Sequence, residues 1–309
     1  MAEVTVTTIT DPKFGQCTQI SNGIVEVKVA TDFGPRILHC ACVGKENMFF
    51  QDADKVPLGD KYDVFEDQHI LYGGHRLWIS PEIVPRCYHP DNKPATVTPV
   101  EGGARFTAAV EDHNKIQKSF TVTLEKDAPQ IKVSHTIRNV GLWDITLAPW
   151  AITMLAPGGV EVMPMPNRPT GMLPNRNFTF WDYSELNDSR IYFGKDFITL
   201  SQDSSKENAF KLGFNNEAGW AAYFVNGQVF LKYFEPAMGG FYPDGGCDFE
   251  TYTNSKMLEM ETLGEIVELE PDEFVTLEEE WELYPAEQLT ATRDEEAIKA
   301  AVSQWVEIG

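Results

Sequence analysis

The sequence predicts an all-β protein, a sandwich or barrel of many short antiparallel strands, with one amphipathic helix near its C-terminal end. Almost everything before residue 285 alternates between short period-two or β-branched segments and turns rich in Gly, Asn and Pro. Helical spacing appears only after residue 290. The chain of 309 residues with 42% hydrophobic side chains suffices for one large β domain, so we expect residues 1–309 to form a single domain.

The clearest strands are residues 24–29, 120–124 and 131–137, and the clearest hairpin runs from Trp220 to Phe234. Asn226-Gly227 supplies the positive-φ pair of a two-residue type I′ turn. Pairing across this turn predicts an apolar face made of Phe224, Val229, Ala222, Leu231, Trp220 and Tyr233. The opposite face carries Tyr223, Phe230, Phe234 and Lys232, as either a second core with one polar group or the floor of a cleft.

Two segments, residues 52–67 and 157–176, are predicted to be long irregular excursions, the second dense in Pro, Gly, Asn and Met. Compact sandwiches carry such loops mainly for binding. Near the C-terminus, Thr292-Arg293-Asp294-Glu295 matches a capping box, and Ile298, Ala301, Val302 and Trp305 follow at helical spacing. We therefore expect a helix over about residues 293–306 that closes one side or end of the sheet.

The charge and cysteine content limit the partners and the compartment. With 47 acidic and 25 basic residues, the net charge of −22 repels nucleic acid and anionic membranes. The N-terminal segment lacks the features of a signal peptide, and no run of about 18 apolar residues occurs. Five cysteines without a CxxC pair indicate reduced thiols. We expect a soluble cytoplasmic protein that acts on a small molecule, in an oligomeric state that the sequence leaves open.

Glu259 and Glu261 lie two residues apart on an otherwise apolar strand, so they share one face. Buried carboxylates are uncommon unless they are paired or functional. The segment 257–264 is either a solvent-facing edge strand of an acidic protein or part of a site. In the second case we expect Glu261 to point into a concave cleft and Glu259 to lie closer to solvent or beside an arginine.

Residues 72–82 bring His75, Arg76, Trp78 and Glu82 together after two glycines. Such a turn suits a ligand site, because His exchanges protons near neutral pH and Arg offers forked donors to oxygens. The alternative is a turn in which Arg76 pairs with Glu82 and His75 is structural. Arg36 is likewise either an exposed arginine or an inward anchor for a carboxylate or ligand.

Residues 175–183 have the amide, arginine and aromatic composition of sugar contacts, and Arg176 is the candidate oxygen ligand among them. Signatures of nucleotide, metal and serine-hydrolase sites are missing from the sequence. We expect no cofactor and no metal. A cation site at His89 with Asp91, or at Asp244 with Asp248, is the weaker alternative.

Taken in order, these motifs resemble the galactose mutarotase-like (aldose 1-epimerase-like) superfamily, and more closely its DUF4380-type branch. The resemblance covers roughly residues 20–285. Its motifs are Asn22-Gly23-Ile24, Asp32 to Ile37, Gly73 to Trp78, Thr251-Tyr252-Thr253-Asn254, Met260-Glu261-Thr262-Leu263, and Leu269 to Glu273 before the strand that reaches Trp281. The resemblance implies a curved antiparallel β-supersandwich whose concave face binds a sugar.

The resemblance also implies a mechanism, in which a glutamate takes the proton from the anomeric hydroxyl and a histidine donates one to the ring oxygen. Carried over, Glu261 is the base and His75 the acid or a substrate contact. Arg36, Arg76 and Lys232 are oxygen ligands, and Trp78, Trp150, Arg176 and Glu259 complete the predicted binding set.

One departure concerns the family's second histidine, because Pro149-Trp150 occupies its expected place. A tryptophan can stack on a sugar but cannot protonate its ring oxygen. The sequence therefore leaves three functions open: an isomerase of the aldose 1-epimerase type, a carbohydrate-binding or sensing protein without catalysis, and a carbohydrate lyase or hydrolase that uses Glu259 and Glu261.

Overall fold

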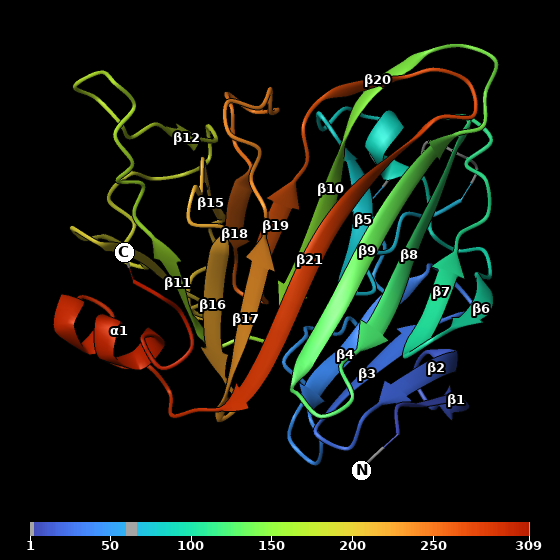
Figure 1. Cartoon of the computed structure of the whole chain (residues 1–309), viewed down its shortest axis with the longest axis horizontal. Coiled ribbons are helices and arrows are strands. Elements are labelled where there is room, and N and C mark those ends of the chain that lie inside the picture. The colour runs from blue at the N-terminus through green and yellow to red at the C-terminus, as the bar shows by residue number, and fades with distance from the viewer. Residues whose placement is uncertain (1–2, 60–66, 309) are drawn as a thin grey trace.

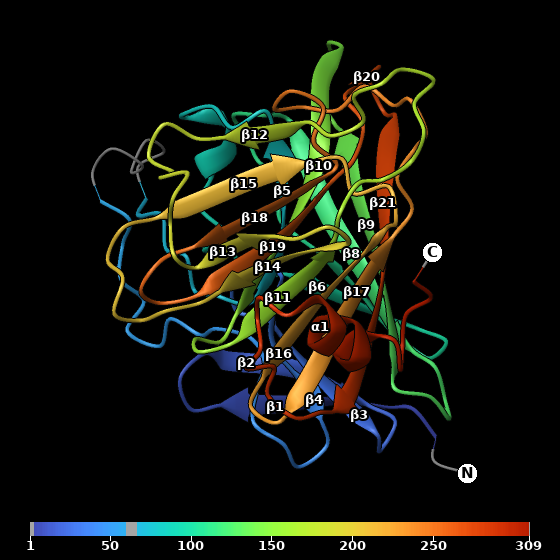
Figure 2. The same cartoon turned by 90° about the vertical axis from the view of Figure 1, so that its left-hand side faces the viewer.

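The structure, a computed structural model, describes residues 3–59 and 67–308. It is almost entirely antiparallel β, in two large sheets stacked face to face, with one short C-terminal helix (Figures 1 and 2). This confirms the predicted fold class.

The first sheet contains eleven strands within the described residues. Their spatial order is β1 (Thr5–Asp11), β2 (Gly15–Ser21), β3 (Val25–Ala30), β4 (Arg36–Cys42), β5 (His75–Ser80), β10 (Ile145–Leu155), β19 (Leu258–Leu263), β18 (Phe249–Thr253), β15 (Phe210–Phe214) and β12 (Phe178–Phe180), with β20 (Val267–Leu269) also paired to β10. A 3-10 turn, η1 (Arg86–Tyr88), follows β5.

The second sheet contains ten strands of the described chain. Their order is β13 (Ile191–Phe193), β14 (Phe197–Ser201), β11 (Val160–Pro164), β16 (Trp220–Val225), β17 (Gln228–Phe234), β21 (Phe274–Pro285), β9 (Gln130–Asn139), β8 (Ile116–Leu124), β7 (Gly103–Thr107) and β6 (Thr96–Val100). The main core lies between the sheets, where Val27 and Phe249 of the first sheet join Phe120, Phe230 and Trp281 of the second.

The predicted strands correspond to β3, β8 and β9, and the predicted hairpin is β16–β17. Its register is confirmed, with Val225 opposite Gln228 and Trp220 opposite Tyr233. On the opposite face of the hairpin, Tyr223, Phe230 and Lys232 are fully buried. That face is therefore part of a core and not the floor of a cleft. The other face of the hairpin is covered by the C-terminal helix.

That helix is α1 (Glu295–Val302), which lies against β16 and β17 in Figure 1. Ile298 and Val302 are buried against Trp220, Phe224 and neighbouring apolar side chains. The helix is shorter than predicted, and its N-cap is Asp294 rather than Thr292. The Asp294 carboxylate accepts hydrogen bonds from two backbone N–H groups of the first turn, so it performs the capping.

The excursion predicted over residues 157–176 is partly wrong. β11 occupies residues 160–164 and pairs with both β14 and β16, because alternating Val160 and Val162 pack under α1. Of the excursion predicted over residues 52–67, residues 60–66 lie outside the described part. Among the described residues, no helix has the length and apolarity that crossing a membrane requires. All five cysteines are buried and free.

Candidate functional site

A cleft of about 660 Å³ opens on the face of the first sheet that is turned away from the second sheet. Strands β5, β10, β19, β18 and β15 form its floor. The lining residues are Leu58, Leu71, Arg76, Trp78, Glu82, Tyr88, Trp150, Ile152, Trp181, Asp182, Tyr183, Ala209, Lys211, Tyr252, Asn254, Met257 and Glu259. Aromatic walls with a few charged groups are the usual composition of a small-molecule site.

Strand register decides which side chains reach this cleft. Residues directly opposite in antiparallel strands point to the same face. Arg76 lies opposite Ile152, which lies opposite Glu261. One row over, Lys211, Tyr252 and Glu259 are aligned across β15, β18 and β19. These two rows bring Arg76, Lys211 and both predicted glutamates to the cleft side of the sheet.

The aromatic side chains of the cleft are in contact with its cations. Trp78 and Trp150 meet edge to face, with ring centroids 5.5 Å apart. The guanidinium carbon of Arg76 lies 3.5 Å from the Trp78 ring centroid. The Lys211 ammonium lies 4.8 Å from the Trp150 ring and 4.6 Å from the Trp181 ring. Aromatic faces beside forked donors suit a pyranose, which has apolar ring faces and a rim of hydroxyls.

Trp78, Trp150 and Trp181 form an aromatic wall of the cleft. Beneath this wall, the Lys211 ammonium forms ion pairs with two carboxylates. This ammonium is 2.8 Å from Glu261 Oε2 and 2.7 Å from Glu250 Oε2. The Trp150 indole N–H also donates to Glu261 Oε2, at 2.9 Å. Burial lowers the pKa of Lys211, but Glu261 and Glu250 outweigh it and raise this pKa well above its usual value. Glu261 is therefore a fully buried, paired carboxylate under Trp150 and Lys211.

Glu259 is the carboxyl that the cleft exposes. It is half-buried and lines the cavity. Burial and the negative charge of Glu261 raise its pKa to about 8, although Arg76 and Lys211 act in the opposite direction. At neutral pH the Glu259 side chain is thus mostly a neutral carboxylic acid. A carboxyl with a pKa near the working pH can exchange protons with a ligand.

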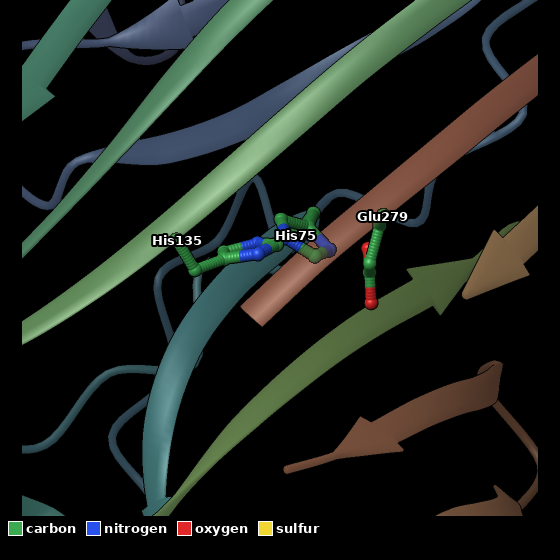
Figure 3. A group of neighbouring side chains, drawn as sticks. All are labelled: His75, His135 and Glu279. Carbon is green, nitrogen blue, oxygen red and sulfur yellow. Dashed lines mark hydrogen bonds between the residues drawn. The ribbon is translucent and has the colours of Figure 1, made fainter. Parts of the chain in front are cut away.

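His75 does not lie beside Glu261, so the expectation that these two residues act on one sugar as acid and base is wrong. His75 lies opposite Thr153, on the face of the sheet that packs on the second sheet. Its Nε2 is 2.7 Å from Nε2 of His135, a residue of β9 (Figure 3). Burial and the neighbouring cations hold the pKa of His75 well below its usual value. His75 is the structural histidine of the alternative interpretation, not a substrate contact.

Burial lowers the pKa of both His75 and His135, so we assign both imidazoles as neutral. Nδ1 of His135 then carries the proton, because its partner is the carbonyl of Leu277 at 2.8 Å. In neutral rings the His135 Nε2 accepts from the Nε2–H of His75, and Nδ1 of His75 accepts from the Thr153 hydroxyl at 2.8 Å. Every ring nitrogen of the pair is thus in a hydrogen bond.

Lys232 belongs to the same core, so its predicted role as an oxygen ligand is wrong. Its ammonium is 2.8 Å from Glu279 Oε1 and also donates to Thr153 Oγ1 at 3.1 Å. The ligand atoms of His75, His135 and Glu279 lie within 4.8 Å of one another. A metal ion does not fit them as they stand, because the ring nitrogens are engaged with each other and an ammonium already neutralises Glu279.

The structure also places Arg36 and Arg176 outside the cleft. Arg36 is fully buried and forms an ion pair with Asp91 at 3.1 Å, which matches the inward anchor considered from the sequence. Arg176 is exposed, and it donates to the backbone carbonyls of Pro166 and Lys195. Among the predicted binding residues, Arg76, Trp78, Trp150 and Glu259 line the cavity.

Sequence reasoning missed Lys211, which is the cation at the centre of the site. The available signal was the one that singled out Glu259 and Glu261, namely a charged residue inside the otherwise apolar segment 210–214. Tyr252 and Asn254 were noted only as members of the family-like motif at residues 251–254, not as site residues. Trp181 and Tyr183 were noted for their composition, and both line the cleft.

Comparisons with known proteins identify the fold. The chain matches Slr1438 protein from Synechocystis over 91% of its own length and 96% of that chain, with a TM-score of 0.57 and 11% identity. It matches a galactose mutarotase-like protein from Clostridium acetobutylicum over 92% and 99%, with a TM-score of 0.55 and 10% identity. A galactose mutarotase-like protein from Lactobacillus casei matches over 91% and 100%, with a TM-score of 0.54 and 10% identity.

The chain has the galactose mutarotase-like fold. No family model matches the sequence, and no curated protein matches it. At 10 to 11% identity the structural likeness establishes the fold alone.

Proposed function

We propose that the protein binds a sugar in this cleft and interconverts its anomers, with Glu259 as the residue that exchanges protons. The observation that carries the proposal is the reachable carboxyl of Glu259, whose pKa is raised to about 8 and which lines the same cavity as Trp150, Trp181 and Tyr183. On the sequence motifs we also place the chain in the DUF4380-type branch, and its reduced cysteines favour the cytoplasm.

The chemistry follows from the neutral state of Glu259. A neutral carboxylic acid carries an O–H donor and a carbonyl acceptor side by side. The O–H protonates the ring oxygen while the bond from that oxygen to the anomeric carbon breaks. The carbonyl oxygen accepts the proton of the anomeric hydroxyl, which leaves an open aldehyde and regenerates the neutral acid. Rotation about the bond next to the aldehyde and the reverse transfer give the other anomer.

In this proposal Glu261 is a positioning residue rather than the base that the resemblance implies. Its carboxylate is fully buried under Lys211 and Trp150. It acts on the reaction through its charge, which raises the pKa of Glu259. It also holds Lys211 in place against the aromatic wall.

The first test is the pH dependence of the proposed reaction. Because the active form of Glu259 is protonated, kcat/KM should stay on a plateau below about pH 8 and fall about tenfold per pH unit above it. Polarimetry or NMR exchange spectroscopy on a panel of aldoses measures the rate. A profile that rises through pH 8 would require an ionised carboxylate and would overturn the proposed role.

Glu261→Gln should move this profile to lower pH. The substitution removes the negative charge that disfavours ionisation of Glu259, so the falling limb should shift by about one pH unit. Glu278→Gln, which removes an exposed carboxylate on β21, is the matched control and should leave the limb in place. A loss of rate at all pH values without a shift would instead support Glu261 as the base.

A binding protein without catalysis is the second candidate. It is favoured by Trp150, which stands where the resemblance implies a histidine, and by the described lining of the cleft, which contains no histidine. A sugar-dependent rise in Tm without any acceleration of anomer exchange by the wild-type protein would select this function.

A further inference from the structure

Among the buried Arg and Lys side chains of the described residues, Arg76 alone forms no ion pair. It is 2% exposed, and its Nε and Nη1 atoms have no hydrogen-bond partner. The described residues also provide no carboxylate within 4.0 Å of its guanidinium. The other buried cations all form ion pairs: Arg36 with Asp91, Lys118 with Glu111, Arg190 with Asp188, Lys211 with Glu250 and Glu261, and Lys232 with Glu279.

A shortage of acids does not explain this exception, since the chain has 47 acidic residues against 25 basic ones. The nearby carboxyls are engaged elsewhere or neutral. Asp91 pairs with Arg36 at 3.1 Å and lies 3.7 Å from Lys118. Glu259 is mostly protonated at neutral pH. A buried charge without a partner is costly, which is why burial lowers the pKa of Arg76 to about 9.

The position of Arg76 indicates what its partner is. The residue lines the cleft, and its guanidinium carbon lies over the Trp78 ring, 3.5 Å from the ring centroid. This cation–π contact holds the guanidinium at the wall of the cleft, and a guanidinium carries its forked N–H donors in its own plane. This arrangement matches the two oxygens of a carboxylate or phosphate. The acids Glu82 and Asp182 also line the cleft, but both are exposed to solvent.

We propose that the ligand of the cleft is an acidic sugar, whose carboxylate or phosphate pairs with Arg76 while its ring packs on the aromatic wall. This inference deepens the proposed function and rests on it for the sugar ring. The anion supplies the missing counter-charge of Arg76, and the anomeric centre lies toward Glu259. A neutral sugar would leave Arg76 unpaired and should bind more weakly.

The test compares D-glucuronate, D-glucose 6-phosphate and D-glucose by isothermal titration and by anomer exchange. Wild-type protein should bind one of the two acidic sugars at least tenfold more tightly than glucose. Whichever acidic sugar binds more tightly shows whether the site prefers a carboxylate or a phosphate. Arg76→Met should remove that preference, so that the acidic sugars bind the variant no more tightly than glucose does. Arg138→Met removes an exposed arginine of β9 that pairs with Asp272, so it controls for net charge and should keep the preference.

The inference and the proposed function fail in different ways. If glucose binds and exchanges as well as both acidic sugars, the function stands and the acidic substrate is wrong. If no sugar of the panel binds the wild-type protein, both fall. Should Arg76→Met not fold, the wild-type preference for an anion, and its weakening between 50 and 500 mM salt, still decide the question.

Discussion

Glu259→Gln lowers the rate of anomer interconversion by about 10² to 10⁴-fold, the usual contribution of a general acid or base. The amide keeps the shape of the side chain and can still donate a hydrogen bond to a sugar, but it cannot give up a proton. Sugar affinity should therefore change by less than about fivefold. The loss should appear in kcat rather than in KM.

A control for this prediction is Tyr252→Phe, which lies opposite Glu259 on β18 and also lines the cleft. It removes one hydroxyl from the cavity and leaves every carboxyl in place, so its rate should fall by no more than about tenfold. If Glu259→Gln retains the wild-type rate while Glu261→Gln loses it at every pH, the proton exchange belongs to Glu261.

Lys232→Met should lower the free energy of unfolding by about 3 to 5 kcal/mol, the typical effect of removing one partner from a buried ion pair. The ammonium and Glu279 are both fully or almost fully buried between the sheets, at 2.8 Å. Lys232 also donates to the backbone carbonyls of Ala151 and Met260, on the two strands beneath the cleft. Urea unfolding measures the change.

Two further variants make this stability prediction specific. Lys132→Met breaks the exposed pair with Glu125, at 2.9 Å, and should change the free energy of unfolding by less than about 1 kcal/mol. The double variant Lys232→Met/Glu279→Gln should recover part of the loss, because no uncompensated charge then stays in the core. Equal effects of Lys232→Met and Lys132→Met would contradict this account of the core.

The identity of the site residues shows where inference from sequence ends. His75 and Arg76 are adjacent and were both placed in the pocket, as members of a turn. They are instead the first two residues of β5, and consecutive strand residues point to opposite faces. Only Arg76 faces the cleft. The motif was located correctly, but the start of the strand decided which of its members could meet a ligand.

The sequence by itself determined the local structure of this protein. Period-two patterning predicted the strands, Asn226-Gly227 predicted the hairpin and its register, and two-residue spacing put Glu259 and Glu261 on one face. These features depend on short-range geometry. The tertiary structure decided which face became the cleft and which became the core. It also set the roles of the two glutamates, because burial and charge depend on residues distant in sequence: Lys211 and Trp150 enclose Glu261, and Glu259 is left facing the cavity.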